Sequence, residues 1–173
     1  FPSLALDASD NPRISYYDNT NSDLKYAAFE NSLWSIQIVD NQGGAHTSLA
    51  LDAVGRPRIS YDSIVGGLKY AAFNGTAWSI QDVDSSGDDF FYTSLALDLS
   101  GNPRISYLDG TSLVLKYAFF DGSIWHIQTV DGAGREGEAS GHAGEPRQQR
   151  ARVQVETICS QLARADRDKG RGR

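Results

Sequence analysis

The sequence predicts an all-β fold of the β-propeller type, with three four-stranded antiparallel blades followed by a tail. A unit of about 45 residues occurs three times, each copy has room for four short strands, and residues 1–131 show no helical spacing of apolar side chains. Four strands in about 45 residues is the content of one propeller blade. We expect blades at about 1–47, 48–93 and 94–131, and a basic, Gly/Arg-rich tail at 132–173.

Each unit contains the same short motifs in the same order. It begins with Ser-Leu-Ala-Leu-Asp, continues with Pro-Arg-Ile-Ser-Tyr and Leu-Lys-Tyr-Ala, and closes with a Trp, an Ile-Gln pair and Val-Asp. The motifs of the first copy predict strands at 3–6, 13–17, 24–29 and 34–39, because apolar and polar residues alternate there with the period of a strand. Gly, Asn, Asp and Pro lie between these segments, as expected of tight turns.

Composition excludes several classes of protein. The chain is 40% hydrophobic and 10% aromatic, which is enough for a sizeable core and too much for a disordered protein. No apolar run approaches the ~18–20 residues that a membrane helix needs, so we expect no membrane span. The single cysteine excludes a disulfide framework. The net charge of −6 is the sum of −9 in residues 1–131 and +3 in residues 132–173, and the acidic repeats disfavour nucleic-acid binding.

The triplicated motif resembles the tandem repeats of large bacterial extracellular β-propeller proteins. The resemblance covers residues 1–131 and carries the pattern Ser-Leu-Ala-Leu-Asp, Pro-Arg-Ile-Ser-Tyr, Leu-Lys-Tyr-Ala, Trp and Val-Asp. It implies an extracellular or cell-surface location and a binding or scaffolding role, without a defined ligand.

Three arginines occupy equivalent places in the repeats, at Arg13, Arg58 and Arg104. A guanidinium fork suits a carboxylate ligand. However, equivalent positions are spread around a ring rather than gathered in one pocket. We therefore favour a structural role, in which each arginine pairs with a nearby aspartate such as Asp7 or Asp40.

Carboxylates also recur, and we expect most of them to cap turns. An active site needs one asymmetric set of groups, whereas a turn needs its aspartate in every copy, so we predict no catalytic residue and no enzyme activity. The densest acidic loop, 84–89, offers oxygen atoms to a cation but lacks the spacing of an EF-hand loop, so we predict neither a metal nor a cofactor.

Aromatic residues provide the remaining candidates. Trp34, Trp78 and Trp125 recur in the fourth strand, and we expect them to pack between blades, with sugar stacking as the alternative. The run 90–92 occurs only in the connection between the second and third blades, where it either covers the seam, which we favour, or presents a ligand platform. The candidate ligand-binding residues on this loop face are Asp18, Asp62, Asp88, Asp89, Phe90, Phe91, Tyr92 and Asp109.

These observations predict a non-catalytic binding or scaffold segment, whose ligand is a protein or a carbohydrate. The alternative is a lectin-like module that binds glycans, and a glycosidase fragment is disfavoured. In the tail we expect no regular structure except one short helix at 153–165.

Three blades are too few for a closed propeller, which has roughly four to eight. The end faces should therefore be bare, with Ile14 and Tyr16 at one end and Ile105 and Tyr107 at the other. Further blades would come from a second chain or from missing sequence, and the sequence alone favours the latter.

Overall fold

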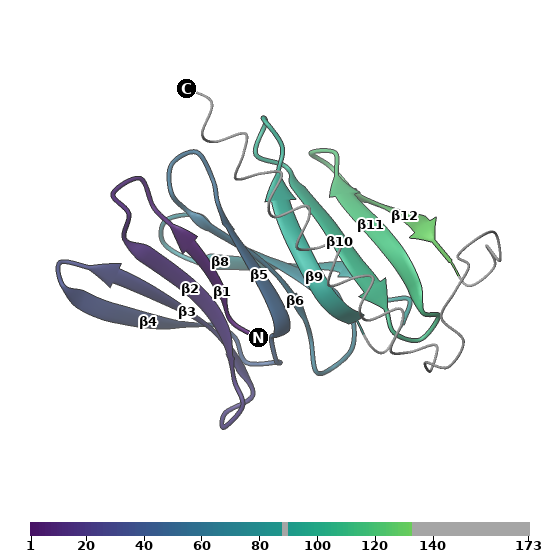
Figure 1. Ribbon diagram of the computed structural model, residues 1–173, viewed down its shortest axis with the longest axis horizontal. Coiled ribbons are helices and arrows are strands. Elements are labelled where there is room, and N and C mark those ends of the chain that lie inside the picture. Colours follow the sequence, from purple (N-terminus) through teal and green to yellow (C-terminus); the bar gives the residue numbers. More distant parts are fainter. Residues whose placement is uncertain (88–89, 133–173) are drawn as a thin grey trace, which may run out of the picture.

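The computed structural model describes residues 1–87 and 90–132. Three four-stranded antiparallel sheets stand side by side along the chain (Figure 1). The fold is all-β and of the propeller type, as predicted. The part of the chain that the structure describes contains no helix that could span a membrane. The predictions for the tail, including the helix at 153–165, lie outside the described residues.

Each sheet is a simple meander in which neighbouring strands follow one another in the sequence. The strands of the first sheet are β1 (Ser3–Leu6), β2 (Pro12–Asp18), β3 (Asp23–Glu30) and β4 (Leu33–Asp40). Those of the second are β5 (Ala45–Leu51), β6 (Pro57–Asp62), β7 (Leu68–Phe73) and β8 (Trp78–Asp84). Those of the third are β9 (Phe90–Leu97), β10 (Pro103–Asp109), β11 (Val114–Phe120) and β12 (Trp125–Asp131).

The turn that follows the first strand of each sheet is built around one aspartate. Asp7, Asp52 and Asp98 each accept backbone N–H bonds from residues two and four positions later, at 2.8–3.0 Å. The third residue after each aspartate has a positive φ, which is 80° and 82° at Gly55 and Gly101. The expected turn-capping role is confirmed at these positions, and it explains why the aspartate occurs in every copy.

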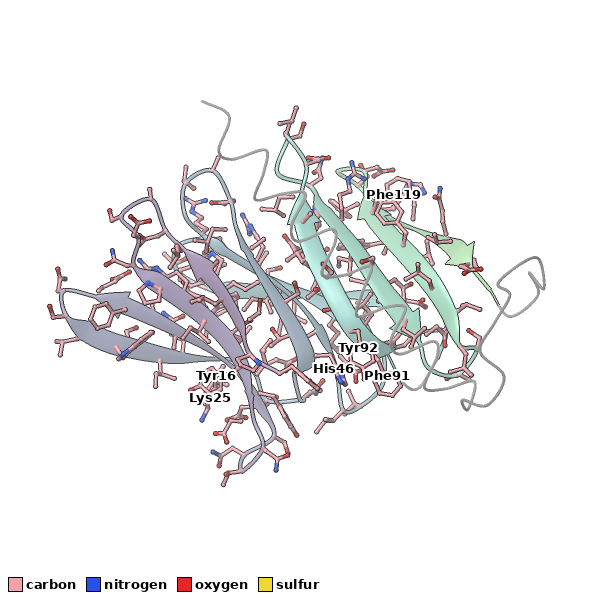
Figure 2. All side chains as sticks on the ribbon, in the orientation of Figure 1. Tyr16, Lys25, His46, Phe91, Tyr92 and Phe119 are labelled. Carbon is pink, nitrogen blue, oxygen red and sulfur yellow. The ribbon has the colours of Figure 1, made fainter. Side chains whose placement is uncertain are left out.

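The sheets have two distinct ends. At the hairpin end lie the turns β1–β2 and β3–β4 and their equivalents. At the connection end lie the turns β2–β3 and their equivalents, together with the segments that join one sheet to the next. Figure 2 shows Phe119 towards the hairpin end, whereas Lys25, His46, Phe91 and Tyr92 lie towards the connection end.

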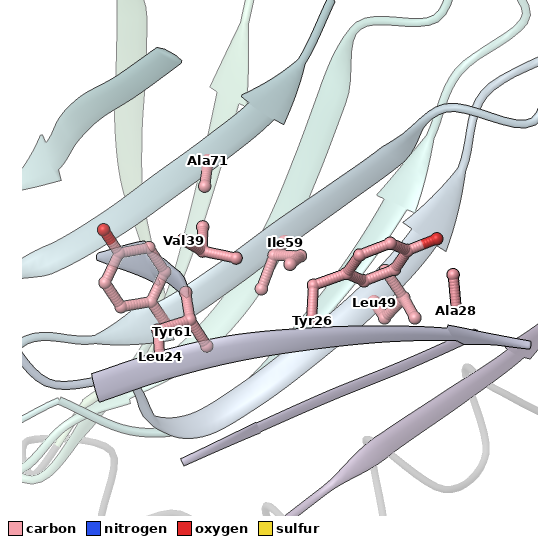
Figure 3. Close-up of a cluster of buried hydrophobic side chains, with 8 residues drawn as sticks. All are labelled: Leu24, Tyr26, Ala28, Val39, Leu49, Ile59, Tyr61 and Ala71. Atoms are coloured by element: carbon pink, nitrogen blue, oxygen red, sulfur yellow. The ribbon is translucent and has the colours of Figure 1, made fainter. Parts of the chain in front are cut away.

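The core consists of two clusters, one at each seam between neighbouring sheets. We call the face of a sheet that contacts the next sheet in the sequence its trailing face, and the face that contacts the preceding sheet its leading face. Each cluster consists of side chains from the trailing face of one sheet and the leading face of the next. At the first seam the trailing face supplies Leu24, Tyr26, Ala28 and Val39, and the leading face supplies Leu49, Ile59, Tyr61 and Ala71 (Figure 3). The second seam repeats this pattern with Leu68, Tyr70 and Val83 against Leu95, Ile105, Tyr107 and Ala118.

One sequence-based expectation about the open ends is wrong. Ile105 and Tyr107 are fully buried against the second sheet and are not on the bare end of the third. Side chains alternate along a strand, so equivalent residues of all three sheets point in the same direction. The Ile and Tyr of Pro-Arg-Ile-Ser-Tyr face the preceding sheet in the second and third sheets, and Ile14 and Tyr16 have no preceding sheet in the part of the chain that the structure describes.

Candidate functional site

Asp18 and Asp109, two of the predicted site residues, lie at the connection end in ion pairs. Asp18 accepts bonds from the backbone N–H of Thr20 and from the Lys25 ammonium group, which holds the pKa of Asp18 well below its usual range. Asp109 pairs with Lys116 at 2.8 Å. Burial opposes the charge of Asp109, but hydrogen bonds to Lys116 and Ser112 outweigh it and lower its pKa. Each carboxylate stabilises its own sheet.

Asp62, the third member of this set, has a different neighbour. The lysine of its sheet, Lys69, pairs instead with Asp82 at 2.7 Å. Asp62 lies 4.0 Å from Nδ1 of His46, measured to its Oδ2. The structure therefore places one of the three carboxylates beside a histidine, while Asp88 and Asp89 lie outside the described residues.

The aromatic run at the start of β9 divides into two parts. Phe90 is fully buried and packs on Tyr107, with ring centroids 5.6 Å apart, so it covers the seam as the favoured interpretation predicts. Phe91 and Tyr92 are only partly buried, and both rings contact His46, at 5.3 and 5.1 Å. Only these two rings of the run offer surface to a ligand.

Phe1 completes an aromatic cluster that sequence analysis missed. Its ring stacks on His46 at 5.2 Å and meets the edge of Tyr92 at 6.3 Å. Phe1, His46 and Tyr92 each stand two residues before the Ser-Leu-Ala-Leu motif. Aligning the repeats places these three aromatic residues at equivalent positions, but only the structure, in which β1, β5 and β9 lie side by side, shows that their rings contact one another (Figure 2).

At the hairpin end, the arginines form the predicted ion pairs. The pairs Arg13–Asp7, Arg58–Asp52 and Arg104–Asp98 have N–O distances of 2.8, 2.8 and 2.6 Å. Arg13 also contacts the exposed Glu30 at 2.6 Å. The alternative partner, Asp40, instead accepts a hydrogen bond from Tyr61 across the seam at 2.6 Å.

The first of these arginines belongs to a larger group that spans the seam, here called the first seam cluster: Arg13, Tyr26, Gln37 and Trp78. Burial raises the pKa of Tyr26, and the neighbouring charge and hydrogen bond of Arg13 oppose this shift. The Tyr26 ring meets the edge of Trp78 at 5.6 Å, and the indole N–H of Trp78 donates to Gln37 at 3.0 Å. Tyr26 therefore contacts both the Arg13 guanidinium and the Trp78 indole, and the indole in turn contacts the Gln37 carboxamide.

The second seam reproduces this arrangement, in the second seam cluster: Arg58, Tyr70, Gln81 and Trp125. Tyr70 meets Trp125 at 5.5 Å, and the Trp125 indole donates to Gln81 at 3.0 Å. Burial raises the pKa of Tyr70 to about 12, against the opposing charge of Arg58. Trp78 and Trp125 thus pack between sheets, as predicted.

The third sheet has half of such a cluster, with two substitutions. Phe119 and His126 replace an alanine and a serine of the other copies. Their rings stack at 4.8 Å, and the Arg104 guanidinium lies over Phe119 at 5.2 Å. Trp34, on the first sheet, is exposed and has no preceding sheet among the described residues, so the expectation that it packs between blades is wrong within one chain. The sequence shows these differences, but not that they lie on an open face.

Within the described ranges, no three His, Cys, Asp or Glu side chains are grouped so as to hold a metal ion. Asp84, from the acidic loop, accepts bonds from Tyr107 at 2.6 Å and from Lys116 at 3.1 Å.

No family model matches the chain, and a search of curated proteins finds no match. Among solved structures, the chain is similar to a fucose lectin from Kordia zhangzhouensis in complex with methyl-fucoside. The TM-score is 0.53 at 18% identity, over 74% of this chain and 97% of that chain. It is also similar to AofleA from Arthrobotrys oligospora, with a TM-score of 0.54 at 14% identity. That match covers 75% of this chain and 41% of AofleA.

The chain shares its fold with a lectin. At these identities the likeness concerns the fold alone. The three sheets correspond to nearly the whole of the Kordia chain and to about two fifths of AofleA. The bacterial extracellular origin that the repeat motif suggests stays a prediction.

Proposed function

We propose that this chain is a non-catalytic carbohydrate-binding module of the lectin type, which binds sugar at the seam clusters. The proposal rests on two facts: an arginine, an indole and a carboxamide recur at both seams, and a fucose lectin has the same fold. Of the two roles weighed for the sequence, glycan binding is therefore preferred to general scaffolding.

The chemistry of a deoxy sugar such as fucose fits these groups. Its hydroxyl groups need planar donors and charged acceptors, which Arg13 and Glu30 supply at the first seam. Its methyl group and ring hydrogens need an apolar surface, which the partly buried Trp78 supplies. One charged side and one aromatic side are what orient a small polar ligand.

The predicted residues of the connection end form the second candidate position for the same function. Phe91 and Tyr92 offer aromatic surface there, with Asp62 close to the same His46. We rank this position second because it is present once, whereas the arginine, indole and carboxamide recur at each seam.

Isothermal titration with methyl fucoside tests both the function and the position. We expect binding at both seam clusters of the full chain. Arg58→Lys and Trp125→Leu remove the fork and the ring of the second seam cluster, so each should weaken binding there by roughly tenfold or more and leave binding at the first seam cluster unchanged. Phe91→Ala is the control at the other end and should bind as the parent does. Circular dichroism confirms that each variant is folded.

The opposite pattern, with loss in Phe91→Ala alone, would move the site to the connection end. A glycan array without any bound sugar would instead exclude the lectin function and favour a protein ligand. Release of fluorophore from fluorogenic glycosides would contradict the non-catalytic role. An extracellular location is proposed with this function and is tested by fractionating the source cells.

A further inference from the structure

The same set of contacts is made at both seams. At each seam, a serine of the earlier sheet forms a hydrogen bond with the threonine that precedes Ser-Leu-Ala-Leu in the later sheet. A tyrosine of the later sheet donates to an aspartate of the earlier sheet, and a tryptophan of the later sheet donates to a glutamine of the earlier sheet. The pairs at the first seam are Ser15–Thr47 at 2.7 Å, Tyr61–Asp40 at 2.6 Å and Trp78–Gln37 at 3.0 Å. Those at the second are Ser60–Thr93 at 2.9 Å, Tyr107–Asp84 at 2.6 Å and Trp125–Gln81 at 3.0 Å.

The leading face of the first sheet carries one half of this set and is exposed. Leu4 is 63% exposed, whereas its equivalents Leu49 and Leu95 are 8% and 9% exposed. Trp34 is 49% exposed, and Tyr16 is only partly buried although its equivalents are fully buried. These side chains are the same residue types as those that pack at the seams.

The trailing face of the third sheet carries the other half. Val130 is 57% exposed, against 7% for Val39 and 6% for Val83. The hydroxyl oxygen of Ser106 is buried and has no hydrogen-bond partner among the described residues, whereas Ser15 and Ser60 in the same position each bond a threonine. A buried hydroxyl without a partner indicates that a neighbour belongs on this face.

We propose that the two faces bind each other between two copies of this chain, head to tail, and close a ring of six sheets. Trp34 of one copy would bond Gln128 and make an edge-on contact with Tyr117 of the other, and Tyr16 would bond Asp131. Each of these residues stands in the repeat position whose equivalents make that contact at both seams. The proposal does not depend on sugar binding.

A second copy fits better than other occupants because both halves of the contact set are present on one chain. Two heterologous contacts related by a twofold axis close the ring and leave no bare face. Six sheets lie within the range of roughly four to eight blades for closed propellers. Of the two sources of further blades that the sequence allowed, the proposal takes the second chain.

Two positions depart from the repeated pattern. The residue that would meet Ser106 is Pro2, which has no hydroxyl, whereas Thr47 and Thr93 stand at the equivalent positions. Phe119 replaces Ala28 and enlarges the apolar surface that Trp34 would meet. Restoring a threonine at Pro2 therefore tests whether the dimer becomes tighter.

Light scattering on the full chain tests the assembly. We expect twice the chain mass of 18.8 kDa at micromolar concentration. Val130→Arg should weaken the dimer by at least about 100-fold, because it places a charge in an apolar contact. Val54→Arg, at an exposed turn of the second sheet, is the matched control and should leave the mass unchanged. A parent chain that is monomeric at all concentrations would overturn the proposal.

Pro2→Thr should tighten the dimer roughly tenfold, because each of the two contacts gains one hydrogen bond at Ser106. An unchanged or weaker dimer in this variant would contradict the head-to-tail geometry.

Disulfide trapping tests the geometry directly, in a Cys159→Ser background. The serine and threonine oxygens of the two seams lie within 2.9 Å, so cysteines at equivalent positions are within disulfide reach. A mixture of Pro2→Cys and Ser106→Cys chains should give a cross-linked dimer on a non-reducing gel, and neither alone should. Ser15→Cys with Thr47→Cys is the control and should cross-link within one chain. Cross-linking of Ser106→Cys alone would indicate a face-to-face dimer and overturn the proposal.

Discussion

The hydrogen bond between Tyr107 and Asp84 ties the third sheet to the second, and its removal should cost measurable stability. The hydroxyl of Tyr107 donates to Oδ2 of Asp84 at 2.6 Å, and both residues are buried. A hydrogen bond to a charged group contributes about 1.5–3 kcal/mol. Because Lys116 still pairs with the carboxylate at 3.1 Å, we expect Tyr107→Phe to lower the free energy of unfolding by about 2 kcal/mol.

Urea denaturation followed by tryptophan fluorescence, at one fixed protein concentration, measures this loss. Tyr17→Phe is the control, because the Tyr17 hydroxyl has no hydrogen bond to any residue that the structure describes, and the change should stay within about 0.5 kcal/mol of the parent. A double-mutant cycle with Asp84→Asn isolates the pair and should give a coupling energy above about 1 kcal/mol. Equal stability of Tyr107→Phe and the parent, or a coupling energy near zero, would refute the reasoning that this bond fastens the seam.

Three further outcomes follow from the turns and the titrating groups. Asp10 has a φ of 59°, whereas the equivalent residues of the other copies are Gly55 and Gly101. Glycine adopts a positive φ without strain, so Asp10→Gly should raise the free energy of unfolding by up to about 1 kcal/mol. Urea denaturation measures this, and a destabilised variant would contradict it. Backbone N–H bonds and a contact with His126 lower the pKa of Asp121 to about 2. The stabilisation from Asp121 should therefore be complete at pH values above its ordinary pKa of 3.8 and be lost as the pH falls from there towards 2. A carboxyl titration by NMR with a midpoint near 4 would contradict this. Burial raises the pKa of Tyr70 to about 12, so the unfolded chain loses the Tyr70 proton at a lower pH than the folded chain does. The free energy of unfolding should therefore fall as the pH rises above about 10, which a series of alkaline thermal melts measures. Melting temperatures that are unchanged to pH 12 would count against this.

Much of the hairpin end could be inferred from the sequence, because its contacts are local in the chain. Asp7 and Arg13 lie six residues apart and recur with the same spacing in every copy, so their pairing was predictable. Trp78 and Trp125 were likewise predictable as seam residues, because a large apolar side chain repeated at the outer strand favours packing against a neighbour. The connection-end aromatic cluster was not predictable, since Phe1, His46 and Tyr92 come from three different sheets.

The sequence by itself determined the fold class, the number of strands in each unit and the turns, because period-two alternation and aspartate or glycine at fixed offsets are local properties. Only the tertiary structure decided the direction in which each side chain points. Equivalent residues of the three sheets point in the same direction, so Tyr107 is buried while Tyr16 is not, although both stand in identical motifs. Whether an identical residue is core or open surface depends on its neighbour in space, which no repeat unit specifies for itself.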